Sequence, residues 1–145
     1  MSDVTPGYTL SARSSQGYDE TVERVRDLLA DAGFGVLTEI DLKATLKAKL
    51  DVDVAPQVIL GACRPQLAHQ ALAADPSVAA LLPCNVVVRE DADGVVVEAF
   101  DPQAMIAMTD AGDAVCEVAN DARARLQQML AALTAASAGP ADGQD

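Results

Sequence analysis

The chain has 145 residues and a formal net charge of −12, and 50% of its residues are hydrophobic whereas only 3% are aromatic. That length corresponds to one domain, and a surface this acidic repels a polyanion over most of its extent. With two Phe, two Tyr and no Trp, the chain also lacks the aromatic faces on which single-stranded bases stack, so we expect no nucleic-acid partner.

The chain opens with a strand and a helix. Residues 7–14 alternate apolar and polar side chains, which is the period of a half-buried strand. Apolar residues then recur at helical spacing from Val22 to Ala32, with Asp19 placed to cap the helix and Gly33 placed to end it.

A second strand and a second helix meet at Asp41. The strand runs from Phe34 to Asp41, with its even-numbered residues expected on one face and Glu39 and Asp41 on the other. The helix carries a leucine at every fourth residue from Leu42 to Leu50, and Asp41 is a suitable N-cap for it.

Three further strands are predicted in the middle of the chain. Residues 57–62 are almost wholly apolar and indicate a buried strand, after which Pro65 fits the first turn of a helix that ends at Asp75. Cys84–Arg89 and Val95–Phe100 are two apolar strands joined by a polar loop that ends in glycine, so they form a hairpin.

Two helices close the chain. The first is short and carries Met105 and Met108 as core residues, and the second covers residues 112–133. Residues 134–145 are rich in Ala and Gly and cannot bury much surface, so we predict a disordered C-terminal tail. The folded domain therefore spans residues 7–133.

The order of these elements predicts an α+β fold of two layers. One five-stranded sheet, mostly antiparallel or mixed, carries helices on one face in the order β-α-β-α-β-α-β-β-α. The other face would expose apolar side chains such as Leu37 unless a second subunit or a ligand covers it. We therefore expect a homodimer.

The cysteine count and the N-terminus indicate a cytoplasmic protein. Three cysteines are an odd and low number, unlike the dense, even-numbered frameworks of small secreted domains. The first residues lack the basic and apolar regions of a signal peptide, and no apolar run approaches the roughly 18–20 residues of a membrane span. We expect no membrane partner.

Cys63 is the first candidate for chemistry. It lies just before a helix N-terminus, where the positive end of the helix dipole stabilises a thiolate and lowers the thiol pKa. Arg64 adds a positive charge at the next position. Such a thiolate is a nucleophile, a persulfide carrier or a metal ligand, whereas the structural alternative is a small hydrophobe at a strand end.

His69 and Cys84 complete the candidate catalytic set. His69 is the only histidine, and its imidazole could approach Cys63 from one turn into the helix, although a lone helical histidine is more often a surface residue. Cys84 meets Cys63 only if their two strands are antiparallel neighbours, which the sequence leaves open. Cys116 is expected to pack within the last helix.

Charged and polar residues near these strand ends extend the predicted ligand site. Glu39 and Asp41 form a carboxylate pair on one strand face, and Lys47 belongs to a cluster that holds all the lysines of the chain. Each has a structural alternative, as a helix cap or a solvated face. The predicted ligand-binding residues are Glu39, Asp41, Lys47, Cys63, Arg64, His69, Cys84 and Asn85.

No established motif accompanies these residues. The chain contains no Cys-x-x-Cys, no His-x-x-x-His, no glycine-rich phosphate loop and no Gly-x-Ser-x-Gly. We therefore predict no metal site, and the sequence leaves the cofactor, the substrate and the reaction unknown.

Four motifs occur in order along the chain: Gly33–Asp41, Lys43–Lys47, Ile59–Cys63 and Leu82–Val88. Together they closely resemble the uncharacterised bacterial family called domain of unknown function 302, over roughly Tyr8 to Leu133. The resemblance implies a two-layer α+β fold that is commonly dimeric, and it implies no established activity. The family usually has Asn before the proline, where this chain has Arg64, which cannot accept the hydrogen bond of an N-cap.

These observations favour a non-catalytic homodimer that binds a small molecule at the strand ends near Cys63, His69 and Cys84. The alternative is a thiol-dependent redox enzyme or sulfur carrier, with Cys63 as nucleophile, His69 as base and Cys84 as resolving thiol. A purely structural interaction module is the third hypothesis. The sequence alone does not decide whether the protein is an enzyme.

Overall fold

The computed structural model describes residues 7–108 and 112–138, with residues 135–138 described by their backbone alone. The elements in chain order are β1 (Thr9–Ser14), α1 (Tyr18–Asp31), β2 (Gly35–Asp41), α2 (Leu42–Leu50), β3 (Gln57–Cys63), α3 (Pro65–Ala74), the 3₁₀ helix η1 (Pro76–Leu81), β4 (Cys84–Asp91), β5 (Gly94–Phe100), α4 (Pro102–Ala107) and α5 (Asp113–Ala138).

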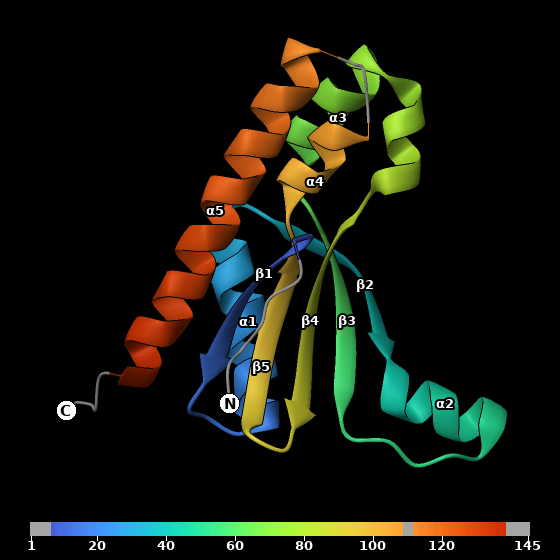
Figure 1. The fold of residues 1–145 in the computed structure, drawn as a ribbon, viewed down its shortest axis with the longest axis vertical. Coiled ribbons are helices and arrows are strands. Elements are labelled where there is room, and N and C mark those ends of the chain that lie inside the picture. The colour runs from blue at the N-terminus through green and yellow to red at the C-terminus, as the bar shows by residue number, and fades with distance from the viewer. Residues whose placement is uncertain (1–6, 109–111, 139–145) are drawn as a thin grey trace.

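All five strands form one antiparallel sheet in the order β1-β5-β4-β3-β2, so β4 is the central strand (Figure 1). The α+β prediction is confirmed, and the sheet is antiparallel rather than mixed. The chain leaves the sheet at Cys63, the last residue of β3, and returns to it at Cys84, the first residue of β4. Both residues lie at the same end of the sheet, because α3 and η1, which connect the two strands, lie beyond that end. The two cysteine-bearing strands are therefore antiparallel neighbours.

The helices α1 and α5 pack on one face of the sheet and form the main core. The sheet contributes aliphatic side chains at alternate positions, and Leu60, Val86 and Val97 are each 0% exposed. Leu29 of α1 and Leu126 of α5 pack against them and are equally inaccessible. Alternation in the strands and helical spacing in the helices thus place their apolar faces together.

A second, smaller core lies beyond one end of the sheet. There α3, η1 and α4 pack against the first half of α5, and Figure 1 shows this group standing above the strand ends. Its buried residues are Ala71, Val78, Met105, Val115, Val118 and Ala119. The long helix α5 connects the two cores because it runs past both.

The segment from residue 35 to residue 56, which we call the arm, leaves much apolar surface uncovered. It comprises β2, α2 and the following loop, and Figure 1 shows α2 projecting from the edge of the sheet. No residue of α2 is buried. The large apolar side chains Leu37, Ile40, Leu50 and Val52 are 64%, 44%, 66% and 42% exposed, respectively.

The strand β2 departs from the predicted alternation. Its register against β3 shifts between Val36 and Thr38, so that Leu37 forms an irregularity and the later residues change sides. Phe34 and Val36 therefore reach the main core, whereas Ile40 does not. The prediction that these residues share one face was wrong.

Several helix ends also differ from expectation. Gly17, not Asp19, is the N-cap of α1, whereas Asp41 caps α2 as predicted by accepting a hydrogen bond from the Ala44 N–H at 2.9 Å. The helix α5 extends to Ala138, past its predicted end at Leu133, and residues 139–145 of the predicted tail lie outside the described residues. Met108 is 60% exposed and is not a core residue.

Candidate functional site

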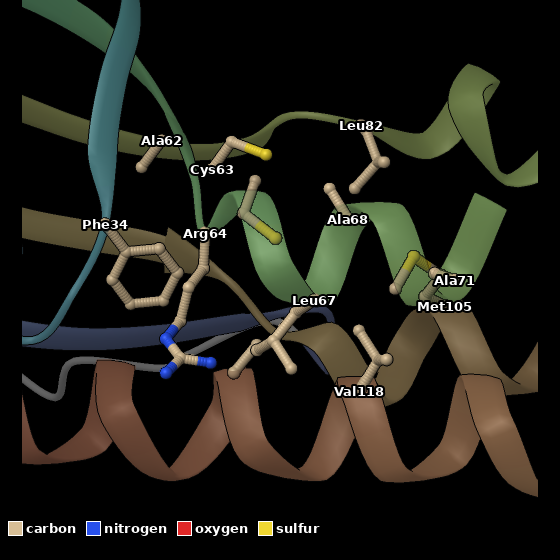
Figure 2. A pocket seen from close by; sticks show the side chains of 12 residues that line it. Phe34, Ala62, Cys63, Arg64, Leu67, Ala68, Ala71, Leu82, Met105 and Val118 are labelled. Carbon is tan, nitrogen blue, oxygen red and sulfur yellow. The ribbon is translucent and has the colours of Figure 1, made fainter. Parts of the chain in front are cut away.

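A small cavity lies where the two cores meet, at the end of the sheet from which β3 leaves. Its volume is about 30 Å³, and its walls are almost wholly apolar. Phe34 and Ala62 of the main core line one side, and Ala71, Met105 and Val118 of the second core line another. Figure 2 shows these side chains around the cavity, together with Cys63 and Arg64.

Two thiols line this cavity. Cys84 pairs with Ala62 across the β3–β4 ladder, and Cys63 follows Ala62, so both cysteines lie at the same end of the sheet. Both are free, and Cys84 is only 6% exposed whereas Cys63 is partly accessible. The question that the sequence left open is therefore answered: the two cysteines share one end of the sheet, with Cys84 on the core face beside Ala62 and Cys63, at the next position, on the opposite face. Met105, which is 2% exposed, adds a third sulfur to the walls.

The environment of the thiols favours their protonated forms. Burial raises the pKa of Cys63 above its ordinary value of 9.0. Burial, with a smaller contribution from Cys63, raises the pKa of Cys84 to about 11. Loss of hydration thus outweighs the helix N-terminus and the adjacent arginine. The expectation of a lowered pKa for Cys63 was wrong.

Arg64 has a structural partner that sequence inspection did not identify. It occupies the N-cap position of α3 without capping it, and its guanidinium lies 3.7 Å from the carboxylate of Asp121 on α5. Arg125 hydrogen-bonds the same carboxylate at 2.8 Å and the Ala32 carbonyl at 2.8 Å. These four residues join the start of α3 to α5 and to the end of α1.

Gly33 is required beside this network. Its φ of +92° belongs to the left-handed region, and a Cβ there would lie 3.1 Å from Arg64 Nε. Only glycine combines that backbone conformation with so close a guanidinium. The predicted end of α1 at Gly33 therefore has a second reason, in the packing of Arg64.

The remaining predicted ligand residues lie away from the cavity. Glu39 forms an ion pair with Arg26, Asp41 caps α2, and Lys47 lies 2.9 Å from Asp51. His69 and Asn85 are exposed and do not line the cavity.

Of the eight predicted ligand residues, the cavity thus brings together Cys63, Arg64 and Cys84. Met105 also lines the cavity, whereas sequence analysis assigned it to the core alone. A methionine carries no motif of its own, so only its position in space identifies it.

Within residues 7–108 and 112–138, no three His, Cys, Asp or Glu side chains are grouped so that they could hold a metal ion. In the same part of the chain, every helix falls short of the length and hydropathy that a membrane crossing needs.

Comparison with known proteins identifies one family that matches most of the described region. The model of the family described as "Domain of unknown function DUF302" matches residues 10–133. The crystal structure of an uncharacterized conserved DUF302 protein from Bacillus stearothermophilus is similar, with a TM-score of 0.78 and 31% sequence identity, over 87% of this chain and 98% of that one. No curated protein matches.

Proposed function

Since this chain belongs to the DUF302 family, whose description names no activity, we propose from its own geometry that it is a non-catalytic binding protein that works as a homodimer. The observation that carries this proposal is the exposed apolar surface of the arm. A helix normally buries one face, yet α2 buries no residue against its own chain. The missing contact is supplied by a second copy.

Three features of the arm favour a second copy of this chain as its partner. The sheet face that carries Ile59 and Val87 is left open by the described helices, and Ile40 pairs with Ile59 across that face. This apolar surface continues from the sheet face onto the projecting helix α2. In a dimer with twofold symmetry, the same surface of each copy can cover that of the other. All lysines of the chain lie on α2, whereas the chain as a whole carries a charge of −12, so a second copy offers an acidic surface to them.

Binding is favoured over catalysis by the state of the thiols. A nucleophilic cysteine requires a lowered pKa or an adjacent base. Burial raises the pKa of both Cys63 and Cys84, and His69, the proposed base, is exposed and outside the cavity. The thiol-enzyme hypothesis therefore loses the two properties on which it rested.

The proposed ligand site is the cavity at Cys63, Arg64 and Cys84. Its volume of about 30 Å³ is far below the roughly 300–1,000 Å³ of pockets that hold drug-sized molecules. The ligand is therefore an ion or a molecule of very few atoms. Three free cysteines favour a reducing compartment, so we place this function in the cytoplasm.

The oligomeric state tests the proposed homodimer. Wild-type protein should sediment as a dimer, and Leu37→Asp and Leu50→Asp should each shift it to monomer, because a buried carboxylate at the interface is strongly unfavourable. Tyr8→Asp is the matched control, since Tyr8 is 59% exposed and lies beside β1, at the opposite edge of the sheet. A monomeric wild type, or dissociation by Tyr8→Asp alone, would reject the arm as the interface.

A further inference from the structure

We propose that the cavity where the two cores meet binds a neutral, apolar diatomic gas of the size of dioxygen, held by packing and without a covalent bond. This inference rests on the proposed ligand site and names the class of its ligand. It does not depend on the proposed dimer.

The walls of the cavity are the first observation. Ala62 and Cys84 pair across the β3–β4 ladder and lie on the core face of the sheet, where both are buried. Met105 of α4 and Val118 of α5 are also buried and line the cavity from the second core. The walls are almost wholly apolar. Apolar cavities inside proteins stay dry and accept apolar guests.

The size of the cavity is the second observation. Protein interiors leave few voids larger than a water molecule. The volume of about 30 Å³ exceeds the roughly 10–15 Å³ that one water molecule needs. The space therefore corresponds to about two or three atoms of that size, which is the size of a diatomic gas.

An ion is a poor occupant because the cavity offers it no charge. Burial raises the pKa of Cys84 to about 11, so this thiol is uncharged at neutral pH. Among the described residues that line the cavity, Arg64 alone carries a charge, and its guanidinium lies 3.7 Å from the carboxylate of Asp121. Figure 2 shows that guanidinium directed to the helix that carries Val118. A charge placed among apolar side chains without a partner is strongly unfavourable.

Water is a poor occupant for a related reason. A buried water molecule typically forms about three hydrogen bonds with polar groups of the protein. Walls that are almost wholly apolar do not supply them. An apolar molecule, in contrast, gains dispersion contacts with wall atoms that otherwise face empty space. The cavity therefore favours an apolar guest over both water and ions.

A route into the cavity is present on one side. Leu67 and Ala68 of α3 and Leu82, which precedes β4, line the cavity and are each partly exposed. A neutral gas passes between such aliphatic side chains without the loss of hydration that makes the same path costly for an ion.

The position of the cavity gives its occupant a structural effect. Phe34 and Ala62 belong to the main core, whereas Met105 and Val118 belong to the second core. A molecule bound between them packs against both sets of side chains at once. Binding of the gas therefore strengthens the contact between the two cores.

Paramagnetic relaxation by dissolved dioxygen tests the inference. Methyl protons of the full-length protein are observed by NMR under dioxygen pressure, with nitrogen at the same pressure as the diamagnetic reference. We expect the excess relaxation at Ala62, Ala71 and Met105 to be several times that at Leu29 and Val97, which are as deeply buried but do not line the cavity. Equal relaxation of the two sets of methyl groups would overturn the inference.

Two substitutions on α3 provide a matched pair. Ala68→Leu extends a side chain into the cavity, whereas Ala73→Leu makes the same change at an exposed position outside it. Ala68→Leu should reduce the excess relaxation at Met105 to the level of Leu29, and Ala73→Leu should preserve it. Circular dichroism checks that both variants are folded. An excess that persists in folded Ala68→Leu contradicts binding in this cavity.

A third variant acts in the opposite direction and does not require the cavity to accept a larger side chain. Met105→Ala enlarges the cavity, so the excess relaxation at Ala62 and Ala71 should increase. A decrease at both methyl groups in the folded variant would contradict the inference.

The dimer, the ligand site and the gas can fail separately. A monomer with excess relaxation at the cavity rejects the proposed assembly and supports the gas. Uniform relaxation in the wild type, together with an Ala68→Leu variant as stable as the wild type, rejects the gas. That second result leaves the cavity standing as the proposed site for a different small ligand.

Discussion

The stability of this protein should fall in alkaline solution because of one buried thiol. Burial and the neighbouring Cys63 raise the pKa of Cys84 from 9.0 to about 11 in the folded protein. Between these two values the unfolded chain loses the Cys84 proton while the folded chain keeps it. The stability contribution is therefore fully present below pH 9.0 and is lost as the pH rises to about 11.

The size of the effect follows from the same pKa. A rise from 9.0 to about 11 corresponds to about 3 kcal/mol of unfolding free energy, because each tenfold change in a proton affinity is worth about 1.4 kcal/mol. The conversion is reasonable for Cys84 because its side chain is nearly inaccessible, at 6% exposure. Cys63 adds to the effect in the same direction, since burial also raises its pKa.

Urea unfolding of reduced protein over this pH range measures the effect. The unfolding free energy of wild type should decrease with pH more steeply than that of Cys84→Ala, by about 3 kcal/mol in total. Other groups that titrate at high pH contribute equally to both proteins and cancel in the difference. Cys116→Ala, which removes a thiol outside the cavity, should follow the wild-type profile.

Parallel profiles for wild type and Cys84→Ala would refute this reasoning. They would mean that burial leaves the pKa of the Cys84 thiol at its unfolded value. The experiment therefore tests the site as well as the stability.

Two further predictions concern the sheet. Gly61→Ala should lower the free energy of unfolding in urea by about 1–3 kcal/mol, because its Cβ would lie 2.9 Å from the ring of Pro83. Gly7→Ala is the control and should be neutral, because there is open space around Gly7. Equal effects of the two substitutions would contradict the packing at Gly61. Hydrogen bonds from Arg13 lower the pKa of Asp91 from 3.8 to about 2. Their stabilising effect on the fold is therefore present above pH 3.8 and is lost as the pH falls to about 2. An NMR titration in which the Asp91 carboxyl group titrates near pH 3.8 would contradict this prediction.

Local patterns in the sequence predicted most of the elements. Alternation identified the strands, and the turn between β4 and β5 identified the hairpin, because these depend on neighbours in the chain. The cap at Asp41 was predictable for the same reason, since it bonds only three residues ahead. The irregularity at Leu37 was not, because it depends on how β2 pairs with β3.

The site was predictable in its residue types but not in its geometry. Cys63 and Cys84 were identified by their positions at strand ends, yet their proximity required the strand order, which alternation does not contain. His69 was included because it lies close to Cys63 in sequence, whereas its side chain is exposed. Met105 was assigned only to the core because its place in the cavity wall depends on α4 packing at the end of the sheet.

Arg64 illustrates why a charge cannot be assigned a chemical role from its neighbours in sequence. Beside Cys63 it suggested an activated thiolate, but its guanidinium turns to Asp121, far along the chain, and Arg125 shares that carboxylate. An arginine held in an ion pair stabilises a nearby thiolate less than an unpaired arginine does. Burial of the thiol acts in the opposite direction, because it raises the thiol pKa. The same arrangement leaves one net positive charge next to the cavity. That charge is too weak to ionise a buried thiol, because burial keeps the pKa of both Cys63 and Cys84 above the ordinary value.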